Sequence, residues 1–242
     1  MDVMQIQNLS VPARLNALEL SLKQGEVLGI LGANGAGKST LLHCLAGIQS
    51  YQGQVLLNGA CLSRMAEQKR AQQLGFLPQS SQSVWALSVR EVIHLGRLPW
   101  RDTNPAAVRA AAEATQVTQW LDRPVSQLSG GQQARVWLAR VLAGQPQIIL
   151  ADEPIASLDL RQQQRVLQLL QAQARSGKSV MLSIHDLSLA ARYCDRLALL
   201  HQGQLIAVGN AEQVLTHANL GRAFQIDAHI DLHSHPPIIM PK

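Results

Sequence analysis

The segment that most constrains this chain runs from Gly32 to Ser39 and has the form G-x-x-x-x-G-K-S. In such a loop the glycines let backbone N–H groups turn toward bound phosphate, the lysine reaches the β and γ phosphates, and the serine hydroxyl holds Mg²⁺. The apolar run 27–31 before the loop predicts a strand, and the helical spacing of residues 39–46 predicts a helix with Gly47 as its C-cap. The chain is therefore predicted to bind a nucleoside triphosphate.

Short apolar strands alternate with helices over much of the chain. Strands are predicted at residues 4–11, 54–57, 75–77, 148–151, 180–184, 197–200 and 204–208. A helix at 161–175 follows one of the apolar strands, and this alternation predicts a parallel sheet covered on both faces. The predicted fold class is α/β, a P-loop NTPase (RecA-like) core with an N-terminal antiparallel β portion and an inserted helical lobe.

The inserted lobe is expected between about residues 83 and 144, where strand signals disappear. Helices are predicted there at 105–115, started by Asn104 and Pro105, and at 132–142. The chain has 242 residues, 47% of them hydrophobic, which suffices for a sizeable core. We therefore expect one domain over residues 1–242, lobe included.

Charge and cysteine content limit the possible classes of protein. The net charge is +5, but no block of five or more like charges appears, so we expect no nucleic-acid partner. A nucleotide site or a nearby anionic membrane accounts equally well for the excess. Cys44, Cys61 and Cys194 form no C-x-x-C pair, which points to reducing cytosol rather than to a disulfide framework or zinc site. Because no apolar run is long enough to cross a bilayer, any membrane part must come from another chain.

Two acidic residues end the apolar strand 148–151. Asp152 suits the coordination of Mg²⁺, and Glu153 suits a general base beside a phosphate loop. The alternative is a solvated cap of the next element.

The segment Leu128-Ser129-Gly130-Gly131-Gln132 places a serine and two glycines at the start of a predicted helix, where free N–H groups favour an anion. Together with the phosphate loop and the acidic pair, it makes the chain resemble the nucleotide-binding subunit of ATP-binding cassette (ABC) transporters. The resemblance implies a homodimer that sandwiches two ATP molecules, each between the phosphate loop of one subunit and this segment of the other. Taken alone, without the other motifs, the segment is better explained as an ordinary helix N-cap.

The resemblance implies roles for three further positions. Gln79 corresponds to a glutamine that contacts Mg²⁺ and the water, and His185 to a histidine at the γ-phosphate. Ser157-Leu158-Asp159 matches a loop at the dimer interface, although Asp159 as a plain helix N-cap is an equally economical explanation.

The resemblance implies ATP and Mg²⁺ as cofactors. The implied catalytic residues are Glu153, His185 and Gln79. The implied ATP-binding residues are Gly32, Ala33, Asn34, Gly35, Ala36, Gly37, Lys38, Ser39, Thr40 and Asp152. Binding from the partner subunit is assigned to Ser129, Gly130, Gly131, Gln132 and Asp159. The implied Mg²⁺ ligands are Ser39, Gln79 and Asp152.

The chain departs from the family pattern upstream of the phosphate loop. Family members usually stack an aromatic side chain on adenine there, but residues 11–15 include none. The manner of adenine recognition stays open, with Arg14 as one candidate cover for the base.

Residues 88–100 and 185–187 resemble the branch that powers importers of iron–siderophore complexes, haem and vitamin B12. The resemblance implies an ATPase at the cytoplasmic face of the inner membrane, bound to permease subunits and served indirectly by a substrate-binding protein. The aromatic-free stretch 11–15 places vitamin B12 first, with a ferric siderophore or haem as the alternative. A soluble ABC ATPase without a transport role is a remote alternative.

Two groups of residues have open roles. Five apolar residues of the lobe either face the permease or belong to the core of the lobe, and the two interpretations are about equally supported. They are Trp85, Leu87, Val89, Val92 and Trp100. His229, His233 and His235 have spacings that can chelate a metal, but a flexible polar tail is the better interpretation.

Overall fold

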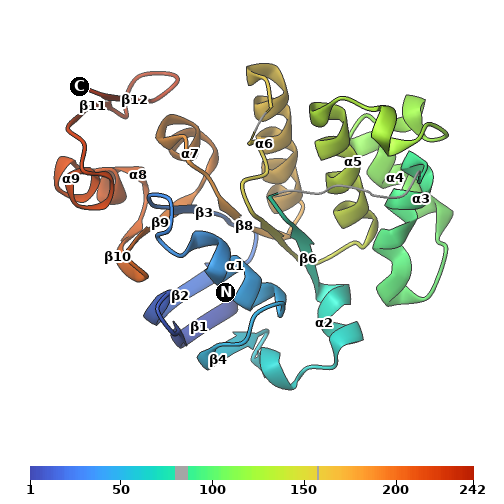
Figure 1. Cartoon of the computed structure of the whole chain (residues 1–242), viewed down its shortest axis with the longest axis horizontal. Helices are drawn as coiled ribbons and strands as arrows, with labels where there is room; N and C mark the ends of the chain where they lie inside the picture. Colours follow the sequence, from blue (N-terminus) through green and yellow to red (C-terminus); the bar gives the residue numbers. More distant parts are fainter. Residues whose placement is uncertain (80–86, 157) are drawn as a thin grey trace.

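A largely parallel sheet forms the centre of the molecule (Figure 1). In the computed structural model, which describes residues 1–79, 87–156 and 158–242, this sheet has six strands in the order β10-β9-β3-β8-β7-β6. Its strands are β3 (Val27–Leu31), β6 (Leu74–Leu77), β7 (Ile148–Ala151), β8 (Ser179–Ser183), β9 (Arg196–His201) and β10 (Gln204–Gly209). All neighbours are parallel except β10, which pairs antiparallel with β9.

An antiparallel sheet covers one side of the central sheet. Within the described ranges it has the order β2-β1-β4-β5. Its strands are β1 (Asp2–Val11), β2 (Leu15–Lys23), β4 (Gln52–Leu57) and β5 (Ala60–Cys61). This sheet confirms the predicted N-terminal antiparallel portion.

The strands of the central sheet are buried because both of their faces are covered. Leu28 and Ile30 of β3 pack with α1 (Lys38–Ala46) and the antiparallel sheet, whereas Val27 and Leu31 pack with helices on the opposite face. Every residue of β3, β7 and β8 is buried. This is the pattern that the uninterrupted apolar runs predict.

A helical region lies beside the sheet, at the right of Figure 1. Its described elements are α3 (Val89–His94), η2 (Leu95–Trp100), α4 (Pro105–Ala114), η3 (Thr118–Trp120), η4 (Val125–Gln127) and α5 (Gly130–Ala143). As predicted, Asn104 caps α4: its side chain accepts a hydrogen bond from the N–H of Ala107 at 3.2 Å. These helices confirm the predicted helical portion of the fold.

Burial distinguishes core residues from exposed ones among the residues of this region that could face the permease or belong to the core. Val89 and Val92 are completely buried, so they belong to the core and do not face a partner. Leu87 packs partly buried against the same core, whereas Trp100 is 38% exposed. Trp85 lies outside the described residues.

Several further elements were not predicted from the sequence. They include β2, β5, α3, η2, η3 and η4, whose bounds are given above. The others are η1 (Leu62–Arg64), α2 (Glu67–Gln73), α7 (Leu187–Tyr193), α8 (Ala211–Val214), α9 (His217–Phe224), β11 (Ala228–Asp231) and β12 (Ile238–Pro241). Strands β11 and β12 form a hairpin, so the tail carries regular structure where a flexible segment was expected. In the described chain, no three His, Cys, Asp or Glu side chains group as a metal site would require. None of the described helices has both the length and the apolar character needed to cross a membrane.

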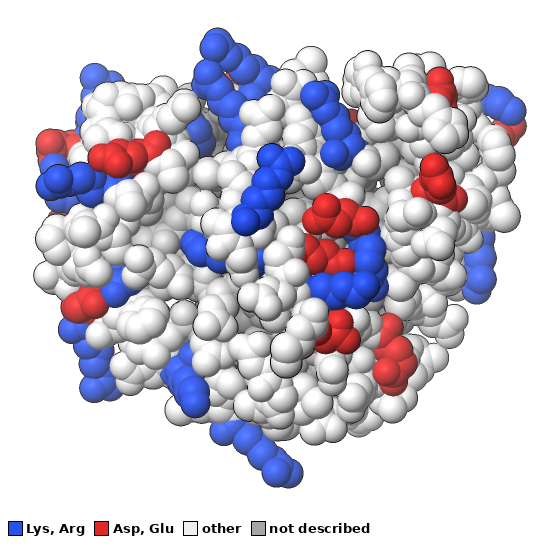
Figure 2. Space-filling model, turned by 180° about the vertical axis from the view of Figure 1, so that it is seen from behind, with Lys and Arg blue, Asp and Glu red and all other residues white. Residues whose placement is uncertain are grey.

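Surface charge is dispersed over the face seen in Figure 2. Lys and Arg stand in separate groups there, with Asp and Glu between several of them. The excess of basic residues therefore forms no continuous patch on that face.

Candidate active site

The phosphate loop connects β3 to α1 and approaches its neighbours closely. Gly32 and Gly37 have φ values of 146° and 108°, in the region that L side chains rarely adopt. A Cβ at Gly37 would lie 2.5 Å from Cδ2 of Leu15, and one at Gly32 would overlap the backbone oxygen of Leu200. The two glycines are therefore required by space as well as by backbone conformation.

Lys38 begins α1 and folds back over the loop. Its Nζ donates hydrogen bonds to the carbonyl oxygens of Gly32 at 2.8 Å and Ala33 at 3.1 Å. Burial lowers the pKa of this ammonium group, and the nearby carboxylates of Glu153 and Asp152 partly oppose that shift. The loop thus presents a largely buried cation whose bonds to carbonyl oxygens are exchangeable for bonds to phosphate.

Asp152 follows β7 directly and is only 2% exposed. Its Oδ1 accepts a hydrogen bond from the hydroxyl of Ser183, at the end of the adjacent strand β8, at 2.6 Å. The same hydroxyl accepts a hydrogen bond from the backbone N–H of Glu153 at 2.7 Å. One serine therefore fixes both acidic residues at the carboxyl edge of the sheet.

Glu153 lies between the other two residues predicted to be catalytic. Its Oε2 accepts a hydrogen bond from Nε2 of Gln79 at 2.7 Å, and its Oε1 lies 2.5 Å from Nε2 of His185. Glu153 also has a φ of 47°, which is uncommon outside glycine. The structure therefore brings Glu153, Gln79 and His185 together.

A polar cleft of about 380 Å³ joins these residues to the phosphate loop. It is lined by Arg14, Asn34, Gly35, Gly37, Lys38, Ser39, Thr40, Gln79, Glu153 and His185. The remaining loop residues predicted to bind ATP, Gly32, Ala33 and Ala36, do not line the cleft, and neither does Asp152. A smaller hollow of about 320 Å³ adjoins the cleft and shares Arg14 and Gly35 with it.

The residues predicted to bind the ATP of a partner subunit lie outside this cleft. Ser129 caps α5 in a reciprocal pair with Gln132: its hydroxyl accepts from the N–H of Gln132 at 3.4 Å, and Oε1 of Gln132 accepts from the N–H of Ser129 at 2.9 Å. Ser129 and Gly130 are exposed, Gly131 is half-buried, and none of these residues lines the cleft. A single chain therefore does not bring this segment to its own phosphate loop.

Asp159 acts as the N-cap of α6 (Leu160–Arg175). Its Oδ1 accepts a hydrogen bond from the N–H of Gln162 at 2.8 Å. Asp159 therefore has the N-cap role that the sequence left as one of two explanations. Its carboxylate is exposed and, like Ser129, does not line the cleft. Ser157 lies outside the described residues.

Sequence reasoning missed Ser183. Its only sequence signal is a hydroxyl residue two positions before His185 in the otherwise apolar run 180–184.

Comparisons with known proteins agree with the site. The family described as ABC transporter matches residues 15–156. The hemin import ATP-binding protein HmuV of Bordetella avium is 42% identical over 250 residues, covering 96% of this chain and 95% of the relative. HmuV of Pseudomonas aeruginosa is also 42% identical, over 253 residues that cover 98% of this chain and 99% of the relative.

A solved structure has the same fold along nearly the whole chain. It is an ABC transporter assigned to the metal-chelate type, in an inward-facing conformation, and it covers 99% of this chain and 96% of its own with a TM-score of 0.85 and 26% identity. The family match, the relatives and the phosphate-binding architecture agree, and the chain belongs to the ATPases of the ABC transporter family.

Proposed function

We propose that Glu153 is the residue that orients and deprotonates the attacking water. Both of its carboxylate oxygens are occupied, one by Gln79 and one by His185. Each of these oxygens keeps a second lone pair, so a water can donate to Glu153 while Gln79 and His185 hold the carboxylate in place beside the cleft. When ATP fills the cleft, Lys38 would exchange its loop carbonyl bonds for the β and γ phosphates.

The donors at the cleft fit Mg²⁺. A carboxylate, an amide oxygen and a hydroxyl are hard oxygen ligands. Gln79 and Ser39 line the cleft, and Asp152, which does not line it, offers its carboxylate from the end of β7 next to Glu153. Ser183 engages Oδ1 of Asp152, which leaves Oδ2 as the oxygen for the ion. When bound, Mg²⁺ neutralises charge on the phosphate oxygens.

Glu153→Gln tests the catalytic assignment. The amide keeps the size of the side chain but accepts no proton, so ATP binding should persist while hydrolysis falls by roughly 10²–10⁴-fold. Binding and turnover are to be measured on the reconstituted transporter. Glu113→Gln, the same change at an exposed position of α4, should leave turnover unaltered. More than half of the wild-type turnover in Glu153→Gln would refute the assignment.

We further propose that the transporter is an importer and that its cargo is hemin. The observation that carries this proposal is 42% identity to two hemin import ATP-binding proteins over almost their full length. These relatives support the haem alternative better than vitamin B12, which the sequence alone had placed first on the aromatic-free stretch 11–15. That stretch borders the nucleotide cleft, and the cargo never reaches it, so it is a poor guide to cargo.

Uptake by cells of the source organism tests the cargo. Deletion of the chromosomal copy should abolish growth on hemin as the only iron source, and restoring the copy should return it. Uptake of labelled ferric siderophore and labelled cobalamin should be unaltered in the same strain. If the deletion strain uses hemin normally but no longer takes up ferric siderophore or cobalamin, the lost compound is the cargo instead of hemin. If it takes up all three normally, the protein does not power an importer of these compounds.

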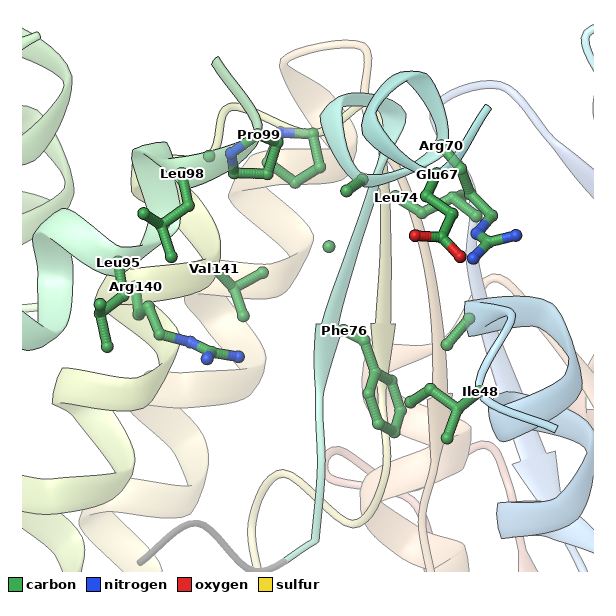
Figure 3. A pocket seen from close by; sticks show the side chains of 16 residues that line it. Ile48, Glu67, Arg70, Leu74, Phe76, Leu95, Leu98, Pro99, Arg140 and Val141 are labelled. Atoms are coloured by element: carbon green, nitrogen blue, oxygen red, sulfur yellow. The ribbon is translucent and has the colours of Figure 1, made fainter. Parts of the chain in front are cut away.

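A groove of about 510 Å³ between α2 and the helical region suits a membrane subunit (Figure 3). Ile48 and Leu98 line it and are 64% and 67% exposed. Its charged lining residues are Glu67, Arg70 and Arg140. We propose that a cytoplasmic segment of the permease docks here, since such apolar exposure is costly without a partner. Leu98→Arg should prevent co-purification with the permease, whereas Val208→Arg, at an exposed site on β10 outside the groove, should not.

A further inference from the structure

A second cavity lies away from both the ATP cleft and the permease groove. It has a volume of about 260 Å³ and is bounded by the end of α4, by α5 and by α6. Leu138, Val166 and Leu169 provide apolar wall, and Arg135 and Arg165 line it from two different helices. The uncharged polar residues of the lining are Thr115, Gln116 and Gln168. Two cations and an apolar wall are an unusual lining for a space between packed helices.

Arg135 is incompletely satisfied where it lies. Its Nε is buried and has no hydrogen-bond acceptor among the described residues. Its one bond to a carbonyl, from Nη1 to the oxygen of Gln116, is long at 3.5 Å, and its guanidinium stacks 4.7 Å from the ring of Trp120. Because a buried donor without an acceptor is destabilising, the position calls for an acceptor that the described chain does not supply.

The charge in this cavity is also uncompensated. In the part of the chain that the structure describes, neither arginine has a carboxylate oxygen within 4.0 Å. Burial lowers the pKa of Arg135, the charge of Arg165 lowers it further, and the carboxylate of Asp159 opposes part of that shift. Two like charges facing one small space repel each other, and an anion between them would remove the repulsion and satisfy the free N–H.

We propose that this cavity binds a small oxyanion, a phosphate or a carboxylate, between Arg135 and Arg165. Guanidinium groups present paired N–H donors that match such oxyanions, and the cavity has room for one. Its position suggests the consequence of binding. Arg135 lies six residues after Ser129 on α5, and Arg165 lies six residues after Asp159 on α6. A bound oxyanion would join the two helices and fix the distance between these two capping residues.

Trp120 provides a local reporter because it stacks on Arg135. The full chain is titrated with sodium phosphate and, separately, with sodium acetate, with sodium chloride at equal ionic strength as the screening control. Tryptophan fluorescence and Tm are recorded. Wild type should give a saturable fluorescence change with phosphate or acetate but not with chloride, and Trp120→Phe should abolish this change.

Arg165→Gln should weaken the binding at least about tenfold, because it removes one of the two charges that hold the anion. Arg161→Gln is the matched control: it lies one turn earlier on α6, is exposed and does not line the cavity, so it should bind as wild type does. Phosphate bound at the phosphate loop raises Tm equally in both variants, so only a difference between them reports on this cavity. An equal response in the two variants, a chloride response equal to that of phosphate, or no response in either measurement overturns the proposal.

Discussion

A single hydroxyl organises the acidic end of the ATP cleft. Ser183 donates to Asp152 and accepts from the backbone of Glu153, so it links the proposed metal ligand to the proposed base. It is fully buried, which means that water does not replace it when it is lost. Glu153 depends on this support because its backbone has a φ of 47°.

Ser183→Ala should therefore reduce kcat more than it changes KM for ATP. We expect a loss of about tenfold in kcat, which corresponds to roughly 1.4 kcal/mol of transition-state stabilisation. Steady-state ATPase assays of the reconstituted transporter measure both constants. Ser179→Ala removes a buried hydroxyl from the other end of β8 and should leave kcat unchanged. Equal losses in the two variants would show a general effect on the strand instead.

Among individual site residues, the sequence predicts best those that belong to a motif with a fixed backbone conformation. Lys38, Ser39 and Asp152 follow from the phosphate loop and the strand end, and the structure gathers the loop, Glu153 and Gln79 around one cleft. Ser183 could not be predicted in the same way, because its role depends on the register of β8 beside β7. Register between strands distant in sequence leaves no local signal.

Close packing of the helical region depends on Gly96. This residue lies in η2, and a Cβ there would overlap the backbone oxygen of Arg140 in α5 and lie 3.2 Å from Cβ of Ala143. A backbone oxygen within a helix has little freedom to move aside. The contact of η2 with α5 therefore requires a residue without a side chain.

Gly96→Ala should destabilise the chain. Overpacking against a helix backbone costs roughly 1–3 kcal/mol, which lowers Tm by at least about 2 °C for a chain of this size. Gly221→Ala in α9 is the matched change, since a Cβ there meets only one atom at 4.0 Å. That control should be neutral or stabilising, because alanine favours helix. Thermal unfolding followed by circular dichroism compares the two, and an unchanged Tm in Gly96→Ala would contradict the packing argument.

Elements with strong periodicity were predicted with nearly correct bounds, and elements that depend on tertiary contacts were not. The helix predicted at 161–175 is observed as Leu160–Arg175, and the strand predicted at 148–151 has those bounds. The C-terminal hairpin was missed because its order depends on distant partners: Ile239 donates its N–H to the hydroxyl of Ser188, which lies on α7. Sequence patterns report local preference, and this hairpin has little of it.

For the whole molecule, the phosphate loop and the segment at Ser129, both predicted to bind ATP, are separated within one chain. The phosphate loop faces the cleft, while Ser129 caps α5 outside it. We infer that two chains bind ATP between them, each supplying the half that the other lacks. An isolated chain should then be a weak ATPase, and activity should rise with chain concentration.

Mixing two inactive chains tests shared sites directly. Lys38→Ala removes phosphate binding by the loop, and Ser129→Arg puts a bulky side chain at the start of α5, so each variant alone has two defective sites. In a mixed dimer, the intact loop of the Ser129→Arg chain faces the intact Ser129 of its partner, so one complete site returns. ATPase activity should therefore recover in part on mixing. Mixing Lys38→Ala chains with chains that carry both substitutions leaves no complete site and should recover nothing. If dimers of the two single variants are shown to form by cross-linking and yet no activity returns, the ATP sites are not shared between chains.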